Sequence, residues 1–182
     1  MAVPADPDQG AVNALRATAH PVRIRMLSIL TNVEMSASDL ARELDITTAN
    51  ASYHLRYLAK AGLVIEAGET QIRGGVAKLY THPWEASVSS VGATPDDRAS
   101  YVRSLADELL RRAAHRPETS RMYSADGEFW VSASVRARAL ELLTEASGLL
   151  HGGNHRPRTE GTQQVSLTVA LFDMDSSPQA RQ

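Results

Sequence analysis

Hydrophobic residues recur at helical spacing in the segment that opens at Pro21. Val22, Met26, Ile29 and Leu30 stand at i, i+4, i+7 and i+8, which places them on one stripe of an amphipathic helix. A proline is tolerated in the first turn of a helix, because its missing N–H has no intrahelical partner there. The pattern therefore predicts a helix that packs one face into a core.

A shorter helix is predicted to follow it. Ser36 stands three residues before Asp39, the spacing of a capping box, in which a hydroxyl and an acid satisfy free backbone N–H groups. Leu40, Ala41 and Leu44 then supply a short buried face.

Another helix begins after a tight turn. Thr47 or Thr48 can cap a helix over residues 49–61, and Gly62 stands where a helix end favours a left-handed residue. Three positions are spaced to face the core: Ala51, Leu55 and Leu58. Five polar side chains are left on the outside: Thr48, Asn50, Ser52, Tyr53 and Arg56. Two short helices joined in this way predict a helix-turn-helix, and side chains of the outer kind contact base edges and phosphates.

A hairpin is predicted directly after this helix. Residues 63–66 and 76–81 are strand-like, and residues 67–75 form a loop that closes on two glycines and carries Arg73 at its tip. A hairpin behind a recognition helix is a wing, so the order of elements is that of a winged helix-turn-helix.

Charge leaves two functions open for this unit. The chain of 182 residues has a net charge of −2, and residues 1–82 hold eight basic and eight acidic residues. The helix over residues 49–61 nevertheless contains Arg56 and Lys60 and no acid, a local charge of +2. We therefore favour binding to double-stranded DNA, with a winged-helix protein-interaction module as the alternative.

The second half of the chain predicts two long helices and two strands. Thr94, followed by a proline and two aspartates, is a strong helix start. An apolar stripe follows: Val102, Leu105, Ala106, Leu109, Leu110 and Ala113. Six arginines between residues 98 and 121 could alternatively hold DNA. A second amphipathic helix over residues 134–150 is flanked by strand-like runs at residues 128–131 and 164–173, which together suggest a strand–helix–strand unit.

Several chemistries are excluded or disfavoured. The chain has no cysteine, which excludes disulfides, thiolate metal sites and a cysteine nucleophile. Common enzyme motifs are absent, so we expect neither catalysis nor a cofactor. Without a signal sequence or a long apolar run, the expected location is the cytoplasm, away from membranes. We expect His54 to be structural or phosphate-contacting, His151 and His155 to lie in a solvated loop, and Trp84 to pack toward the wing.

Three segments together resemble the ArsR-type winged-helix regulators of bacteria, some actinobacterial members included. They are ATAHPVRIRMLSIL, then SASDLARELDITTANASYHLRYLAKAGLV, then the hairpin that ends in KLYTHP. The resemblance covers about residues 11–82 and implies a homodimeric transcriptional regulator, usually a repressor, that binds a palindromic operator. The residues it assigns to DNA binding are Thr47, Thr48, Asn50, Ser52, Tyr53, Arg56 and Arg73.

The resemblance also implies a role for the second half, where the apolar stripe of the first long helix would form the dimer interface. Metal sensing, known in the family, is not expected here, because His115 is a lone histidine beside Asp107 and Glu108. A small-molecule effector remains open. We therefore expect a mainly α protein with a small β component, divided as a disordered lead-in (1–10), a winged helix-turn-helix (11–82), a linker (83–97), a dimerisation or effector region (98–175) and a frayed tail (176–182).

Overall fold

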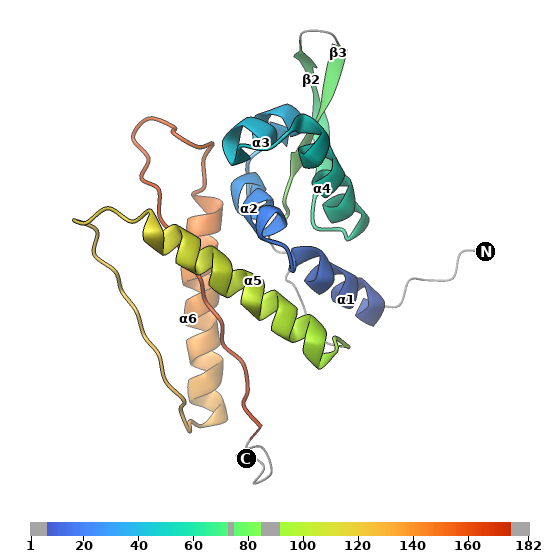
Figure 1. The fold of residues 1–182 in the computed structure, drawn as a ribbon. Coiled ribbons are helices and arrows are strands. Elements are labelled where there is room, and N and C mark those ends of the chain that lie inside the picture. Colours follow the sequence, from blue (N-terminus) through green and yellow to red (C-terminus); the bar gives the residue numbers. More distant parts are fainter. Residues whose placement is uncertain (1–6, 73–74, 85–91, 176–182) are drawn as a thin grey trace.

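The computed structural model describes residues 7–72, 75–84 and 92–175, and it is mainly helical with one small sheet (Figure 1). In chain order the elements are α1 (Pro7–Thr18), α2 (Pro21–Leu30), β1 (Met35–Ser36), α3 (Ala37–Leu44), α4 (Thr48–Lys60), β2 (Ile65–Ile72), β3 (Gly75–Thr81), α5 (Pro95–Ala114) and α6 (Ala133–Gly152). The first helix begins at Pro7, inside the segment expected to be a disordered lead-in.

The core lies among α1 to α4 and the sheet. The predicted stripe of α2 is confirmed, since Met26 and Leu30 are fully buried while Val22 and Ile29 pack partly buried against them. The predicted inner residues of α3 and α4 are also buried: Leu40, Ala41, Leu44, Ala51, Leu55 and Leu58. Burial of this apolar surface is what fixes α4 against the rest of the unit.

The sheet has three antiparallel strands in the order β1–β3–β2. The hairpin β2–β3 is longer than predicted, because β2 continues to Ile72 through residues expected to form a loop. A bulge lies between the paired residues Glu66 and Gly68, and Gly68 has a φ of +146°. A glycine can adopt this backbone without strain, so it bends the strand rather than ending it. With α3 and α4, the hairpin completes a winged helix-turn-helix.

Helix α5 packs on α1 and α2 (Figure 1). Its capping box is formed by Thr94 and Asp97, and Arg16 of α1 donates to both carboxylate oxygens of Asp97 at 2.8 and 3.1 Å. The buried face of α5 carries Ser104 and Glu108, and Glu108 is only 3% exposed.

Glu108 accounts for two of the arginines that were candidates for holding DNA. Its carboxylate accepts hydrogen bonds from Arg111 at 2.6 and 2.7 Å and from Arg112 at 2.9 Å. These two guanidinium groups are therefore engaged within α5.

The apolar stripe of α5 points away from the helices on which α5 packs. Val102, Leu109 and Leu110 are 57%, 47% and 70% exposed. On a helix of 3.6 residues per turn, their positions lie roughly 120° around the axis from Ser104 and Glu108. The stripe is thus a free face in the single chain.

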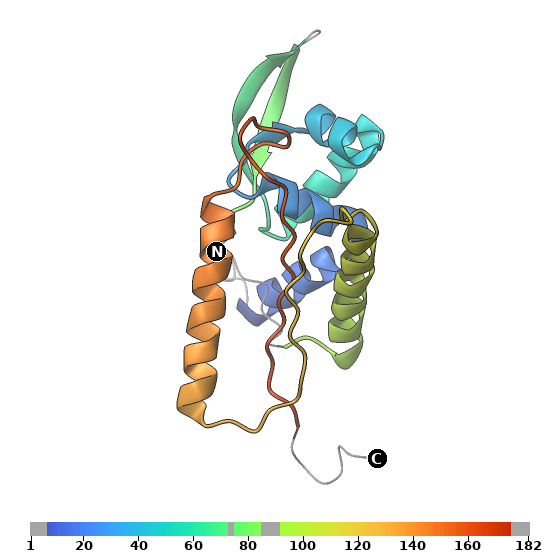
Figure 2. The ribbon, with the colours of Figure 1, turned by 90° about the vertical axis from the view of Figure 1, so that its left-hand side faces the viewer.

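The predicted strands at residues 128–131 and 164–173 are wrong for the single chain. Both runs are extended, but neither is a strand, because a strand requires a hydrogen-bonded neighbour and no segment of the described chain lies beside them in that way. Figure 1 and Figure 2 show both runs extending along the length of α6, away from the winged domain.

The end of α6 is tied to the winged domain. Asn154 donates to the carbonyl of Thr31 at 2.7 Å, and Asn32 donates to the carbonyl of His151 at 2.7 Å. A third link is the ion pair between Arg158 and Glu43 of α3, also at 2.7 Å.

Two aromatic predictions need correction. Trp84 does not pack toward the wing but stacks on His151, with ring centroids 5.1 Å apart and planes within 12°. His151 is therefore partly buried rather than solvated, and its Nδ1 lies 2.7 Å from the carbonyl of Ser147. The flat face of the imidazole packs against the indole ring. This contact joins distant parts of the chain, so the hydrophobic periodicity of one helix does not predict it.

Candidate nucleic-acid interface

The turn between α3 and α4 sets the angle at which α4 is presented. Asp45 ends α3 in the left-handed conformation, with a φ of +54°, and the backbone N–H of Ile46 donates to the carbonyl of Ala41 at 3.0 Å. Thr47 then caps α4, because its hydroxyl accepts from the backbone N–H of Asn50 at 3.1 Å. The predicted cap is therefore confirmed at the first of the two threonines.

The outer face of α4 carries most of the residues predicted to contact DNA. Thr47, Thr48, Asn50, Tyr53 and Arg56 are exposed, and Ser52 is half-buried. Tyr53 is 54% exposed. Because these side chains share one side of a helix, they can be offered together to a groove. Arg73, the remaining member of the predicted set, lies outside the described residues.

Two further residues of α4 belong to this face. Tyr57 is 41% exposed and stands one turn after Tyr53. The guanidinium of Arg23, from α2, lies 4.3 Å from the centre of the Tyr57 ring, a cation–π contact that orients the ring. Lys60 is exposed at the end of the helix. Tyr57 could have been assigned to this face from the sequence, because it stands one helical turn after Tyr53.

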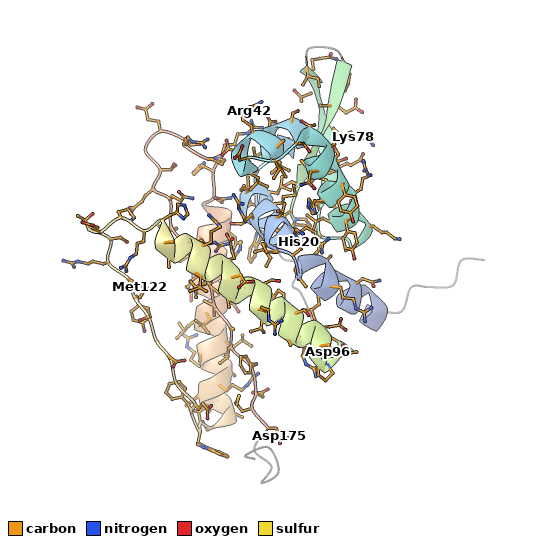
Figure 3. All side chains as sticks on the ribbon, viewed as in Figure 1. His20, Arg42, Lys78, Asp96, Met122 and Asp175 are labelled. Carbon is orange, nitrogen blue, oxygen red and sulfur yellow. The ribbon has the colours of Figure 1, made fainter. Side chains whose placement is uncertain are left out.

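Two cations of α4 have no ion-pair partner among the described residues, whereas Lys78 of the wing has one. Among the ion pairs of the described residues, none involves Arg56 or Lys60. On the wing, Lys78 donates to both carboxylate oxygens of Glu66 at 2.8 and 2.9 Å. An open hollow between α4 and the wing is lined by Ser52, Arg56, Glu66, Lys78 and Tyr80 among others. Figure 3 shows Lys78 at the base of the hairpin.

His54 faces inward from α4 and is only 5% exposed, so it lies in the core rather than on the outer face of the helix. Its ring lies 4.8 Å from that of His20, the residue that caps α2 through Nδ1 (Figure 3 labels His20). Within the described part of the chain, His54 Nδ1 and Arg23 Nε are buried without a hydrogen-bond partner. Burial, together with the positive charge of Arg23, lowers the pKa of both histidines.

The residues predicted to form the dimer interface lie at the surface of the single chain. Leu105 is half-buried, and the other five members of the α5 stripe are exposed. Among the described residues, none of the helices is long and apolar enough to cross a membrane.

Comparison with known proteins agrees with this architecture. Residues 18–66 match the model of a family described as a helix-turn-helix domain, a match that runs from the junction before α2 into β2. The chain therefore contains a helix-turn-helix domain, here of the winged class. No curated protein matches the sequence.

Three solved structures are similar in part. A possible transcriptional regulatory protein from Mycobacterium bovis (fragment 1–100) is 19% identical, with a TM-score of 0.37 over 62% of this chain and 98% of that one. A possible transcriptional regulator for arsenical resistance is 27% identical, with a TM-score of 0.33 over 58% and 98%. Rv0081 of M. tuberculosis is 25% identical, with a TM-score of 0.30 over 54% and 83%.

Proposed function

We propose that this protein is a sequence-specific regulator of transcription that binds double-stranded DNA as a homodimer. The observation that carries the proposal is the outer face of α4, on which polar side chains and the unpaired cations Arg56 and Lys60 are exposed without an acid among them. In a helix-turn-helix the second helix enters the major groove, and the wing then lies along the adjacent backbone. Contacts from the hydroxyls, the amide and Arg56 would identify base edges and hold phosphates.

The homodimer follows from the exposed stripe of α5. Six apolar or small positions on one side of a helix that already packs by its other side favour a second copy as the covering partner. Two copies would present two α4 helices to half-sites about one helical turn apart on a palindromic operator. Bound over a promoter, such a dimer would act as a repressor. An effector bound to residues 98–175 would act by changing the separation of the two α4 helices.

The test is binding of the purified full chain to fragments of its own genome, starting with its own promoter, across a salt series with non-specific competitor. We expect protection of a short palindrome and an affinity that falls as salt rises, because neutralised phosphates release counterions. Salt-sensitive binding without sequence preference would contradict sequence-specific regulation. No binding at low salt would contradict the whole proposal and favour a winged-helix protein-interaction module.

A further inference from the structure

The C-terminal half exposes apolar side chains on a scale that a single folded chain avoids. Among the described residues, 24 large hydrophobic side chains are exposed, and 19 of them belong to residues 102–174. Helix α6 has no buried residue, and Trp130 and Leu149 are 80% and 73% exposed. Contiguous apolar surface of this extent marks a site of association.

The total surface leads to the same conclusion. The chain exposes 13,447 Å², whereas a compact monomer of its mass, 19.7 kDa, exposes about 8,600 Å². The difference of several thousand Å² per chain is larger than the ~800 Å² that each partner buries in an interface of standard size. A stable dimer could therefore be built from this surface alone.

The two extended runs have the pattern of strands that lack neighbours. In the second run Val165, Leu167, Val169 and Leu171 alternate with small or polar residues, the period of a strand with one apolar face. In the described chain, no backbone–backbone hydrogen bond involves residues 121–131 or 163–174. Apart from the Arg121 carbonyl, which accepts from the hydroxyl of Ser120 at 3.5 Å, their N–H and C=O groups are therefore open to pairing with another chain.

The second run is held in a defined place rather than left as a linker. Near the end of the second run, Asp173 accepts from Arg136 of α6 at 3.0 Å. The run begins close to the links between α6 and the winged domain. Figure 3 shows side chains around Met122, itself 66% exposed, standing clear of the rest of the chain.

We propose that a second copy of this chain completes the C-terminal half by strand pairing. Residues 121–131 and 163–174 of the two copies form one intermolecular sheet, and the apolar faces of α5 and α6 pack against it. This inference deepens the proposed dimeric regulator by assigning the surface that holds its two copies together.

A second copy fits better than a foreign protein for two reasons. Each chain supplies both of the missing parts, free strand edges and apolar helix faces, so a two-fold arrangement lets each copy satisfy the other. The surface also belongs to the same half of the chain as the exposed α5 stripe, which the proposed regulator uses for dimerisation. Because every contact occurs twice across a two-fold axis, small changes in this surface have doubled effects.

The test compares two double variants of the full chain by sedimentation equilibrium. Leu167→Asp with Leu171→Asp places charges on the apolar face of the second run, where both side chains are 40% to 43% exposed in the single chain. The matched control is Ile65→Asp with Ile72→Asp, which alters two aliphatic side chains of the wing that are 51% and 47% exposed. We expect the first variant to raise the dimer dissociation constant by at least about a hundredfold and the control to leave it unchanged.

Hydrogen exchange on the unmodified chain tests the strand pairing without any variant. Amides of residues 165–173 should be protected at concentrations at which the protein is dimeric, because paired strands exchange slowly. A monomer at tens of micromolar would overturn the inference. So would a dimer whose 165–173 amides exchange without protection, or one that the charged variant leaves intact. A dimer that fails to bind DNA would contradict the proposed function and leave this inference standing, and a monomer that binds DNA would do the reverse.

Discussion

His54 shows that periodicity assigns the side of a helix but not the chemistry of the side chains there. The inward positions of α4 at Ala51, Leu55 and Leu58 could be predicted from their spacing alone. The contact between His54 and His20 could not, because it joins α4 to the cap of α2 through tertiary packing. The same is true of Tyr57, whose contact with Arg23 depends on how two helices cross.

The two histidines predict a loss of stability in mild acid. Their pKa values are lowered in the folded protein, mainly by burial, so below about pH 6.5 the unfolded chain binds protons that the folded chain does not. Their contribution is complete above pH 6.5, and it is lost as the pH falls from there toward the folded-state pKa values. Urea denaturation between pH 7.5 and 5 should show a falling free energy of unfolding.

A double variant provides the comparison for this effect. His20→Gln with His54→Gln should flatten the pH dependence. An equally steep fall in the double variant would show that other groups cause it.

Arg56 is expected to contribute through phosphate charge. Arg56→Ala should weaken binding to the operator by about tenfold at low salt and reduce the salt slope by about one. The control is Arg138→Ala, which removes an exposed arginine of α6 that pairs with Glu141. Fluorescence anisotropy over a salt series measures both quantities. Equal affinities for Arg56→Ala and the unmodified protein would remove Arg56 from the interface.

Tyr53 is expected to affect which sequence is chosen more than how tightly DNA is held. Tyr53→Phe removes only the hydroxyl, so a base-edge hydrogen bond would be lost while the ring is kept. Selection from a randomised operator library should show a changed preference at one position of each half-site. The comparison is Tyr57→Phe, which removes the hydroxyl of a ring that Arg23 contacts. If the Tyr53→Phe and Tyr57→Phe variants both rank operators as the unmodified protein does, Tyr53 does not contact the bases.

At the scale of elements, the helix caps and the two wing strands could be predicted, whereas the other two predicted strands did not form in the single chain. The capping box of α3, the cap of α4 and the start of α5 depend on residues a few positions apart, so the sequence displays them directly. The runs at residues 128–131 and 164–173 have strand composition, but strand formation depends on a partner, which local sequence does not specify. The length of β2 was underestimated for a related reason. Gly68 belongs to the predicted loop, but in the structure it is paired with β3 beside a bulge.

The cap of α5 gives a prediction at this scale. Thr94→Ala should lower the free energy of unfolding by about 1 kcal/mol, because it removes the hydroxyl that accepts from the backbone of Asp97 at 3.2 Å. Thr94→Ser retains the hydroxyl and should restore most of the loss. Chemical denaturation of the three proteins measures this, and a serine variant as unstable as the alanine variant would exclude capping as the cause.

At the scale of the whole molecule, the relation between the two halves depends on links across more than a hundred residues. No local pattern connects Asn32 with His151 or Glu43 with Arg158, so the placement of α6 beside the winged domain could not be predicted. The apolar stripe of α5, by contrast, could be predicted from the spacing of its residues. Only the structure reveals that α5 packs by a different face and leaves that stripe free.

A dimer of fixed geometry should measure the distance between half-sites. Inserting about five base pairs into the centre of the operator turns one half-site to the opposite side of the duplex, so affinity should fall toward the non-specific level. The control operator keeps its length and has the same number of base pairs at its centre replaced symmetrically. Gel-shift titration of these duplexes would show undiminished binding if the two winged domains were instead flexibly joined.

The ties between the end of α6 and the winged domain have a mechanical consequence. They join α6 to the segment before β1 and, through Glu43, to α3 itself, the helix that supports α4. A displacement of α6 relative to its counterpart in a second copy would therefore be carried as a torque on α3, without any change inside the domain core. The angle at which the two α4 helices meet DNA would then depend on how the α6 helices of the two copies are joined.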